Sequence, residues 1–163
     1  MTINPNYKIT LRENLQNGDI EIFSKMLKKQ GKVKGDLLSK AERCKFICIA
    51  YLDDEPVAIG GIKPKTRSDF YKKKANIPEL EPKFTWELGY LYTVESFNGL
   101  GIGSKIVEII INKFGNENLM ASTEIIENPK MVNILTKNGF ENFGQTWKSS
   151  IHNNELGLFL KFK

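Results

Sequence analysis

The sequence predicts an α/β (α+β) fold of six to seven strands with helices between them, formed by one domain over residues 1–163. Short alternating or apolar segments bounded by turn residues recur along the chain, as strands do. Other segments carry apolar residues at helical spacing. One apolar strand leads through a glycine-rich turn directly into an apolar helix.

The first third of the chain begins with residues 7–12, which alternate apolar and polar side chains as a half-buried strand does. Asp19 is predicted to cap a helix that Gly31 ends, and a short helix follows over residues 36–43. Strands over residues 45–52 and 56–62 then form a hairpin around the turn 53–55.

The remainder of the chain predicts a strand, a helix, a strand, a helix and a closing hairpin. Their ranges are 84–94, 101–114, 119–126, 129–138 and, for the hairpin, 140–151 with 156–162 across residues 152–155. The helix over 101–114 has a predicted buried stripe of Ile102, Ile106, Ile109, Ile110 and Lys113.

The turn between the strand 84–94 and its helix has glycine at every second position, Gly99, Gly101 and Gly103. Backbone N–H groups can converge on an anion there, and the positive end of the helix dipole points the same way. A dinucleotide fingerprint fails because its third glycine would be Ser104, and the Walker A spacing is absent. The turn therefore predicts a phosphate cradle.

Two motifs resemble those of the GCN5-related N-acetyltransferase (GNAT) superfamily. Asn98, Gly101 and Gly103 fit the pyrophosphate loop Q/R-x-x-G-x-G/A, with Asn in place of Gln or Arg. About thirty residues later, the segment from Asn128 to Gly139-Phe140 fits N-x-x-A-x-x-L-Y-x-x-x-G-F. The same segment also predicts an ordinary helix begun by Pro129 and closed by Gly139.

The resemblance implies a mixed, mostly antiparallel sheet splayed between the fourth and fifth strands, acetyl-CoA as cosubstrate and no metal. The pantetheine arm would pair with backbone groups of the fourth strand, and the glycine turn would bind the pyrophosphate. The implied coenzyme contacts are Leu91, Tyr92, Thr93, Asn98, Gly99, Leu100, Gly101, Ile102, Gly103, Ser104 and Asn128.

The implied activity moves an acetyl group from the CoA thioester to a primary amine of a small molecule or protein by direct attack. An alkylamine has a pKa of ~10.4 and must lose a proton first. Glu87, eleven residues before Asn98, matches one family position for the general base, directly or through a water. Another family position falls on Thr123, and the neighbouring Glu124 is the weaker candidate.

The family's usual general acid, a Tyr seven residues after Asn128, is Leu135 here. Water, Tyr90 or Tyr92 are the alternatives for protonating the departing thiolate. This departure keeps open a second function, an acyl-CoA-binding module without turnover.

A basic insertion spans residues 63–83, and its first twelve residues carry a net charge of +5, equal to that of the whole chain. It is expected to be a solvated loop, or to overhang the acceptor entrance and attract an acidic acceptor, a phosphorylated small molecule or RNA, with Phe70 and Tyr71 available for stacking. A third function, a basic nucleic-acid-binding domain, depends on this cluster alone, so nucleic acid is not the expected partner.

The remaining expectations concern chemistry and context. Cys44 and Cys48 would lie roughly 13 Å apart on one strand face, too far for a disulfide, so free thiols are expected. The N-terminus lacks leader features and no apolar run approaches ~20 residues, which predicts a cytoplasmic protein without membrane contact. Homodimerisation through the apolar strand 156–162 is possible. The sequence does not identify the acceptor.

Overall fold

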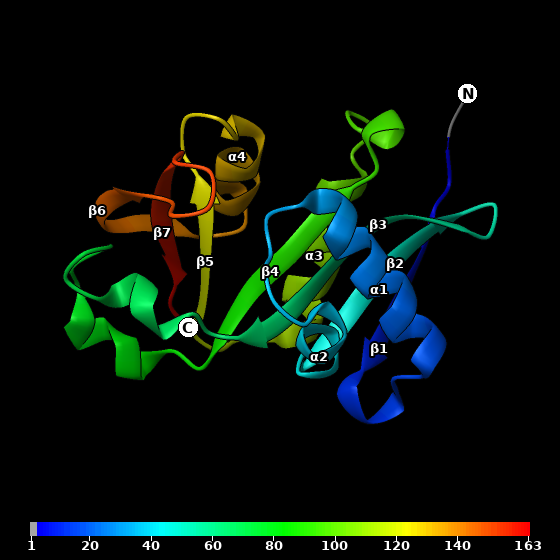
Figure 1. The fold of residues 1–163 in the computed structure, drawn as a ribbon, viewed down its shortest axis with the longest axis horizontal. Coiled ribbons are helices and arrows are strands. Elements are labelled where there is room, and N and C mark those ends of the chain that lie inside the picture. Colours follow the sequence, from blue (N-terminus) through cyan, green and yellow to red (C-terminus); the bar gives the residue numbers. More distant parts are fainter. Residues whose placement is uncertain (1–2) are drawn as a thin grey trace. The chain divides into compact units, whose positions relative to one another are not determined.

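The computed structural model describes residues 3–163 and shows an α+β fold around a mixed seven-stranded sheet of order β1-β2-β3-β4-β5-β7-β6 (Figure 1). The strands are β1 (Asn6–Leu11), β2 (Phe46–Leu52), β3 (Glu55–Pro64), β4 (Trp86–Thr93), β5 (Leu119–Glu124), β6 (Glu141–Lys148) and β7 (Glu155–Lys161). The helices are α1 (Asn17–Gln30), α2 (Leu37–Glu42), α3 (Ile102–Phe114) and α4 (Pro129–Lys137). The predicted fold class is confirmed.

The chain divides into two compact units, and β4 contributes to both. Within the described residues, the first unit comprises 3–63 and 89–114, and the second comprises 64–88 and 115–163. Residues 1 and 2 of the predicted domain lie outside the described part of the chain.

In the first unit, β1, β2 and β3 form an antiparallel meander. Asp53 and Asp54 join β2 to β3 with φ angles of 49° and 66°, the left-handed conformations of a tight hairpin turn. A Cβ on Gly60 would meet Ile106 of α3, whereas a Cβ on the next residue, Gly61, would lie 3.6 Å from Phe23 of α1. Successive strand residues point to opposite faces, so α1 and α3 cover opposite faces of this part of the sheet.

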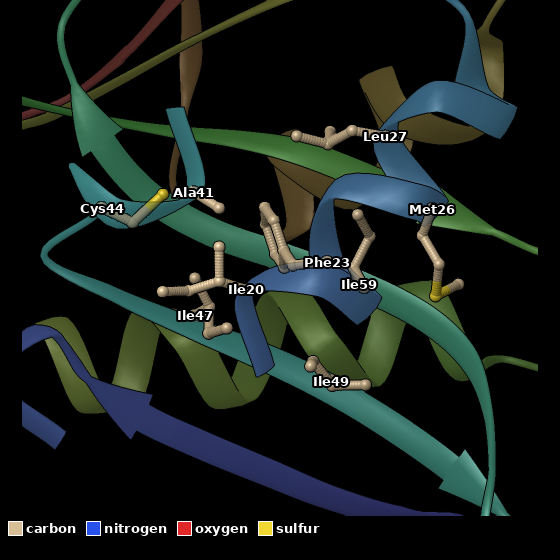
Figure 2. Packing of buried hydrophobic residues seen from close by; sticks show 9 residues of the cluster. All are labelled: Ile20, Phe23, Met26, Leu27, Ala41, Cys44, Ile47, Ile49 and Ile59. Atoms are coloured by element: carbon tan, nitrogen blue, oxygen red, sulfur yellow. The ribbon is translucent and has the colours of Figure 1, made fainter. Parts of the chain in front are cut away.

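Helix α1 packs its apolar side onto β2 and β3 to form a buried cluster (Figure 2). The cluster consists of Ile20, Phe23, Met26, Leu27, Ala41, Cys44, Ile47, Ile49 and Ile59. The prediction that Asp19 caps this helix is wrong: Gln16 is the N-cap, and the Asp19 carboxylate accepts the Gln16 backbone N–H at 3.2 Å from inside the first turn. Gly31, with φ of 76°, ends the helix as predicted.

Helix α3 buries Ile102, Ile106, Val107 and Ile110. Lys113, which the predicted stripe included, is exposed, because the helix turns its last charged residue away from the sheet. The first buried residue, Ile102, is also the first residue of the helix, directly after the glycine turn.

In the second unit, β5 pairs antiparallel with β7, and β7 pairs with β6. The parallel ladder between β4 and β5 joins Trp86 to Leu119 and Glu87 to Met120. Because β7 has a strand on each side, it offers no free backbone edge for dimerisation, and homodimerisation through residues 156–162 stays a prediction.

The insertion between β3 and β4 is anchored in the second unit rather than being a solvated loop. It contains 3₁₀ turns over Arg67–Phe70 and Pro78–Lys83. Phe70 is fully buried in a cluster with Phe84 and Trp147, so it is not available for stacking on a ligand. Ala75 accepts the backbone N–H of Gln145 in β6 at 3.0 Å, which places this segment against β6.

Candidate functional site

The glycine turn after β4 needs glycine for its backbone angles. Gly99 and Gly101 have φ angles of 79° and 82°, in the left-handed region that other residues adopt at a cost. A Cβ at either position would meet nothing within 4 Å, so the turn is open on its outer side. A ligand can therefore approach the backbone closely.

The first turn of α3 directs unpaired N–H groups toward this opening. Its first helical hydrogen bond runs from the Lys105 N–H to the Gly101 carbonyl at 3.0 Å. The N–H groups of Ile102, Gly103 and Ser104 therefore have no acceptor within the helix. A Cβ on Gly103 would lie 3.3 Å from the Thr93 hydroxyl, so glycine also allows α3 to start close to the end of β4.

Most other residues of the predicted cradle lie at the surface. Asn98, Leu100 and Ser104 are exposed, and the side chain of Ile102 is buried. The Asn98 backbone N–H donates to the Glu95 carbonyl at 3.1 Å, which fixes the entry into the turn. Together with the α3 dipole, this geometry suits a phosphate or pyrophosphate.

The end of β4 presents backbone groups beside the turn. The Val94 N–H donates to the Val57 carbonyl of β3 at 2.8 Å. Backbone groups alternate in direction along a strand, so those of Leu91 and Thr93 point away from β3 and those of Tyr92 point toward it. All three side chains are half-buried.

Glu87, the predicted base, lies on β4 within the second unit. It is 6 % exposed, and its Oε1 accepts the backbone N–H of Thr66 at 2.7 Å. A buried carboxylate on a strand is costly unless it is hydrogen-bonded, and the Thr66 N–H supplies one such bond. Glu87 is therefore not a solvent-facing residue, and its role as the general base stays a prediction.

A second buried carboxylate, Glu124, ends β5. Thr123 and Glu124 are both buried. Glu124 accepts from the Asn154 side chain at 3.1 Å, and its other oxygen lies 3.5 Å from Nε2 of His152. His152 Nδ1 accepts the Asn154 backbone N–H at 3.2 Å, which orients the imidazole ring beside Glu124.

The sequence did not indicate this contact between Glu124 and His152. The antiparallel register pairs Glu124 with Leu156, which brings the β6–β7 turn beside the end of β5. Only the order of strands in the sheet could have revealed it.

Helix α4 explains two motif residues structurally. Asn128 caps it by accepting the Met131 backbone N–H at 3.3 Å. Leu135, which replaces the family's Tyr, is 1 % exposed and packs in the interior.

Tyr90 of β4, one alternative for the general acid, is half-buried. Its ring lies 6.1 Å from that of Phe23, and the Lys63 ammonium lies 5.5 Å above it.

The basic insertion neutralises part of its own charge. Lys65 and Arg67 both pair with Glu81, and Lys74 pairs with Asp69 at 3.1 Å. Lys72 and Lys73 are exposed. This pairing weakens the argument for a nucleic-acid-binding surface.

The cysteines are free and buried, as expected, and burial raises the pKa of both Cys44 and Cys48 to about 12. Within residues 3–163, no group of three or more His, Cys, Asp or Glu side chains is arranged to hold a metal ion. None of the helices in this range is both long enough and apolar enough to cross a bilayer.

The structure thus brings together the end of β4, the glycine turn and the start of α3 in the first unit. Glu87 and Asn128 belong to the second unit. A cavity of about 600 Å³ also lies in the first unit, lined by Ile22, Lys25, Met26, Lys28, Lys29 and Pro56, and contains none of the predicted site residues.

Comparison with known proteins agrees with this geometry. The model of the Acetyltransferase (GNAT) family matches residues 13–140, a range that includes the glycine turn, Glu87 and Asn128. No curated protein matches the chain significantly.

Solved structures share the fold over nearly the whole chain. Arabidopsis thaliana Naa50 in complex with a bisubstrate analogue has a TM-score of 0.67 at 14% identity, covering 96% of this chain and 99% of that one. The NatC complex bound to Gag peptide and CoA gives 0.70 at 15% identity, with 99% of each chain covered. An acyl-CoA N-acyltransferase from Pseudomonas aeruginosa gives 0.70 at 8% identity, covering 97% and 99%.

Proposed function

Because the chain belongs to the GNAT acetyltransferase family, we propose that it transfers the acetyl group of acetyl-CoA to a primary amine of a small molecule or protein. The observation that carries the proposal is the open glycine turn with the unpaired N–H groups at the start of α3. Unpaired N–H groups at the start of a helix form a ready anion-binding site, which suits the pyrophosphate of acetyl-CoA.

The residues of the first unit fit acetyl-CoA. The N–H groups from Gly101 to Ser104 would hold the pyrophosphate, and the open space outside Gly99 and Gly101 admits it. The Leu91 N–H and the backbone groups of Thr93, which point away from β3, would pair with the pantetheine arm. When bound, the coenzyme supplies an acetyl thioester that an amine can attack.

Glu87 would accept the proton of the ammonium acceptor, directly or through a water. A primary amine with a pKa of ~10.4 is almost wholly protonated at pH 7, so proton removal is required before attack. The hydrogen bond from Thr66 holds one carboxylate oxygen in place, as a general base requires.

Leu135 cannot protonate the departing thiolate, because its side chain has no acidic proton. Water, Tyr90 or Tyr92 would supply this proton, and a thiol with a pKa near 8.5 makes the requirement modest. The buried leucine also supports a second candidate, an acyl-CoA-binding module that does not turn over.

The test is calorimetric titration of acetyl-CoA and CoA, followed by thiol-release assays with polyamines, amino sugars, lysine peptides and peptides with free N-termini. Binding that Gly101→Glu abolishes, together with amine-dependent thiol release, supports the transferase. Binding without release from any amine supports the second candidate. No binding by the wild-type chain contradicts both.

A further inference from the structure

The last residue of α1, Gln30, reaches the backbone of β4. Its Nε2 donates a 2.7 Å hydrogen bond to the carbonyl of Leu91. A carbonyl can only accept, so the nitrogen of the carboxamide must face Leu91 and its orientation is determined. The oxygen of the same carboxamide is therefore fixed on the opposite side.

The contact falls where β4 departs from regular geometry. Tyr90, immediately before Leu91, has φ of 59°, in the left-handed region that a bulky residue rarely adopts. Phe23 of α1 contacts the Tyr90 ring edge-on, with ring centroids 6.1 Å apart. Helix α1 thus holds this irregular segment at two points, a side-chain ring and a backbone carbonyl.

The free oxygen of Gln30 is the unusual feature. Among residues 3–163, its Oε1 is buried and has no hydrogen-bond partner. A buried polar atom left in this state costs about 1–3 kcal/mol, and each such case needs an explanation. An N–H supplied by a ligand would satisfy it.

A neutral donor suits this oxygen better than an ammonium group. Burial of a charged amine against a single amide oxygen, without a carboxylate, would cost more than it returns. The pantetheine arm of CoA contains two amide N–H groups, and the adjacent backbone of Leu91 is part of the proposed binding strand.

We propose that Gln30 is a positioning residue for the coenzyme, whose Oε1 accepts a pantetheine amide N–H while its Nε2 holds the Leu91 carbonyl. The inference rests on the proposed function, because it requires that CoA binds beside β4. It assigns to the end of α1 a role that the glycine turn does not cover, namely recognition of the arm rather than of the phosphates.

Two substitutions remove the carboxamide. Gln30→Met removes both hydrogen-bonding groups at similar length, and Gln30→Leu removes them in a shorter apolar side chain. The matched control is Lys29→Met, on the exposed neighbouring residue. Calorimetry would measure the Kd of CoA and of 3′-phosphoadenosine 5′-diphosphate, which has the phosphates but no pantetheine arm.

Loss of one hydrogen bond predicts a Kd for CoA that rises about 2- to 12-fold in both Gln30 variants. The Kd of 3′-phosphoadenosine 5′-diphosphate should stay within about twofold, and Lys29→Met should change neither. An unchanged CoA affinity would overturn the proposal, and so would an equal loss for both ligands, which would show general damage to the site. Should Gln30→Met fold poorly, Gln30→Leu is the second variant and decides the question.

The outcome is separable from that of the proposed function. Wild-type protein that binds CoA without releasing thiol contradicts the transferase but leaves the Gln30 prediction intact. Turnover with unaltered CoA affinity in both variants contradicts only the role of Gln30. A wild-type chain that binds no CoA overturns both.

Discussion

The backbone N–H of Thr66 donates a 2.7 Å hydrogen bond to Oε1 of Glu87, so the second residue after the end of β3 positions a buried carboxylate on β4. The two residues are 21 positions apart, and the bond depends on the path that the insertion takes between the strands.

Glu87→Gln is expected to lower kcat about 10²- to 10⁴-fold, because an amide cannot take the proton of the acceptor. The glutamine oxygen can still accept from Thr66, so the melting temperature and the Kd of CoA should change little. Thiol-release kinetics at saturating acetyl-CoA would measure the effect.

Glu124→Gln is the matched control, since it alters the other buried carboxylate described above. We expect kcat to stay within about tenfold of wild type. Large loss in Glu124→Gln with little loss in Glu87→Gln would assign the base to β5 and contradict the role of Glu87.

Gly101→Glu is expected to abolish CoA binding, because it forces a side chain into left-handed backbone at the centre of the proposed cradle. Gly115→Glu imposes similar strain, at φ of 92°, beyond the other end of α3. Both changes should destabilise the chain by roughly 1–2 kcal/mol in urea unfolding. Loss of CoA affinity in both variants would show that strain, rather than the cradle, is responsible.

Cys44 and Cys48 are expected to resist iodoacetamide at pH 8 in the folded chain and to react rapidly in urea, as counted by mass spectrometry. Burial raises the pKa of each thiol from 9.0 to about 12, so very little reactive thiolate forms. Each thiol has a higher pKa in the folded chain than in the unfolded chain. Its contribution to the free energy of unfolding is therefore fully present below about pH 9 and is lost as the pH rises toward 12. Fast alkylation under native conditions would contradict this burial.

Lys65→Met is expected to destabilise the insertion, since Lys65 Nζ also donates to the Phe84 carbonyl at 2.6 Å. The hydrogen bond from Lys65 lowers the pKa of Glu81 from its ordinary 4.5. A lowered folded pKa gives stability that is present above pH 4.5 and is lost as the pH falls through the folded value. Urea unfolding at pH 7 and at pH 3 should therefore show a smaller decrease in the free energy of unfolding for the variant than for the wild type. Equal decreases would contradict the coupling between Lys65 and Glu81.

Local features were predictable from the sequence because their causes are local. The Asp53-Asp54 turn, the Gly31 helix end and the glycine turn each need backbone angles that few residues supply. The predicted start of α1 is wrong because Asp19, although a good N-cap residue, lies inside the first turn. There its carboxylate accepts the backbone N–H of the actual N-cap, Gln16.

Contacts between distant segments were not predictable in this way. Gln30 and Leu91 are 61 residues apart, and no period or motif relates them. Likewise, the Glu124 and His152 contact depends on β7 lying between β5 and β6, which hydrophobic patterns do not specify. The charge of the insertion could be read from the sequence. The burial of Phe70 could not, because it depends on packing with residues of β6 and β7.

The packing of the insertion against β6 bears on the solubility of the protein. β6 is the last strand of the sheet, and an open terminal strand invites strands from other molecules to add to it. Here the ladder shifts register between Phe143 and Trp147, Gly144 has φ of 75°, and the Gln145 N–H is taken by Ala75. A Cβ on Gly144 would collide with the Ala75 carbonyl, so this position accepts only glycine while the cover is in place. The insertion thus protects the chain from edge-to-edge aggregation, a role that its charge alone would not suggest.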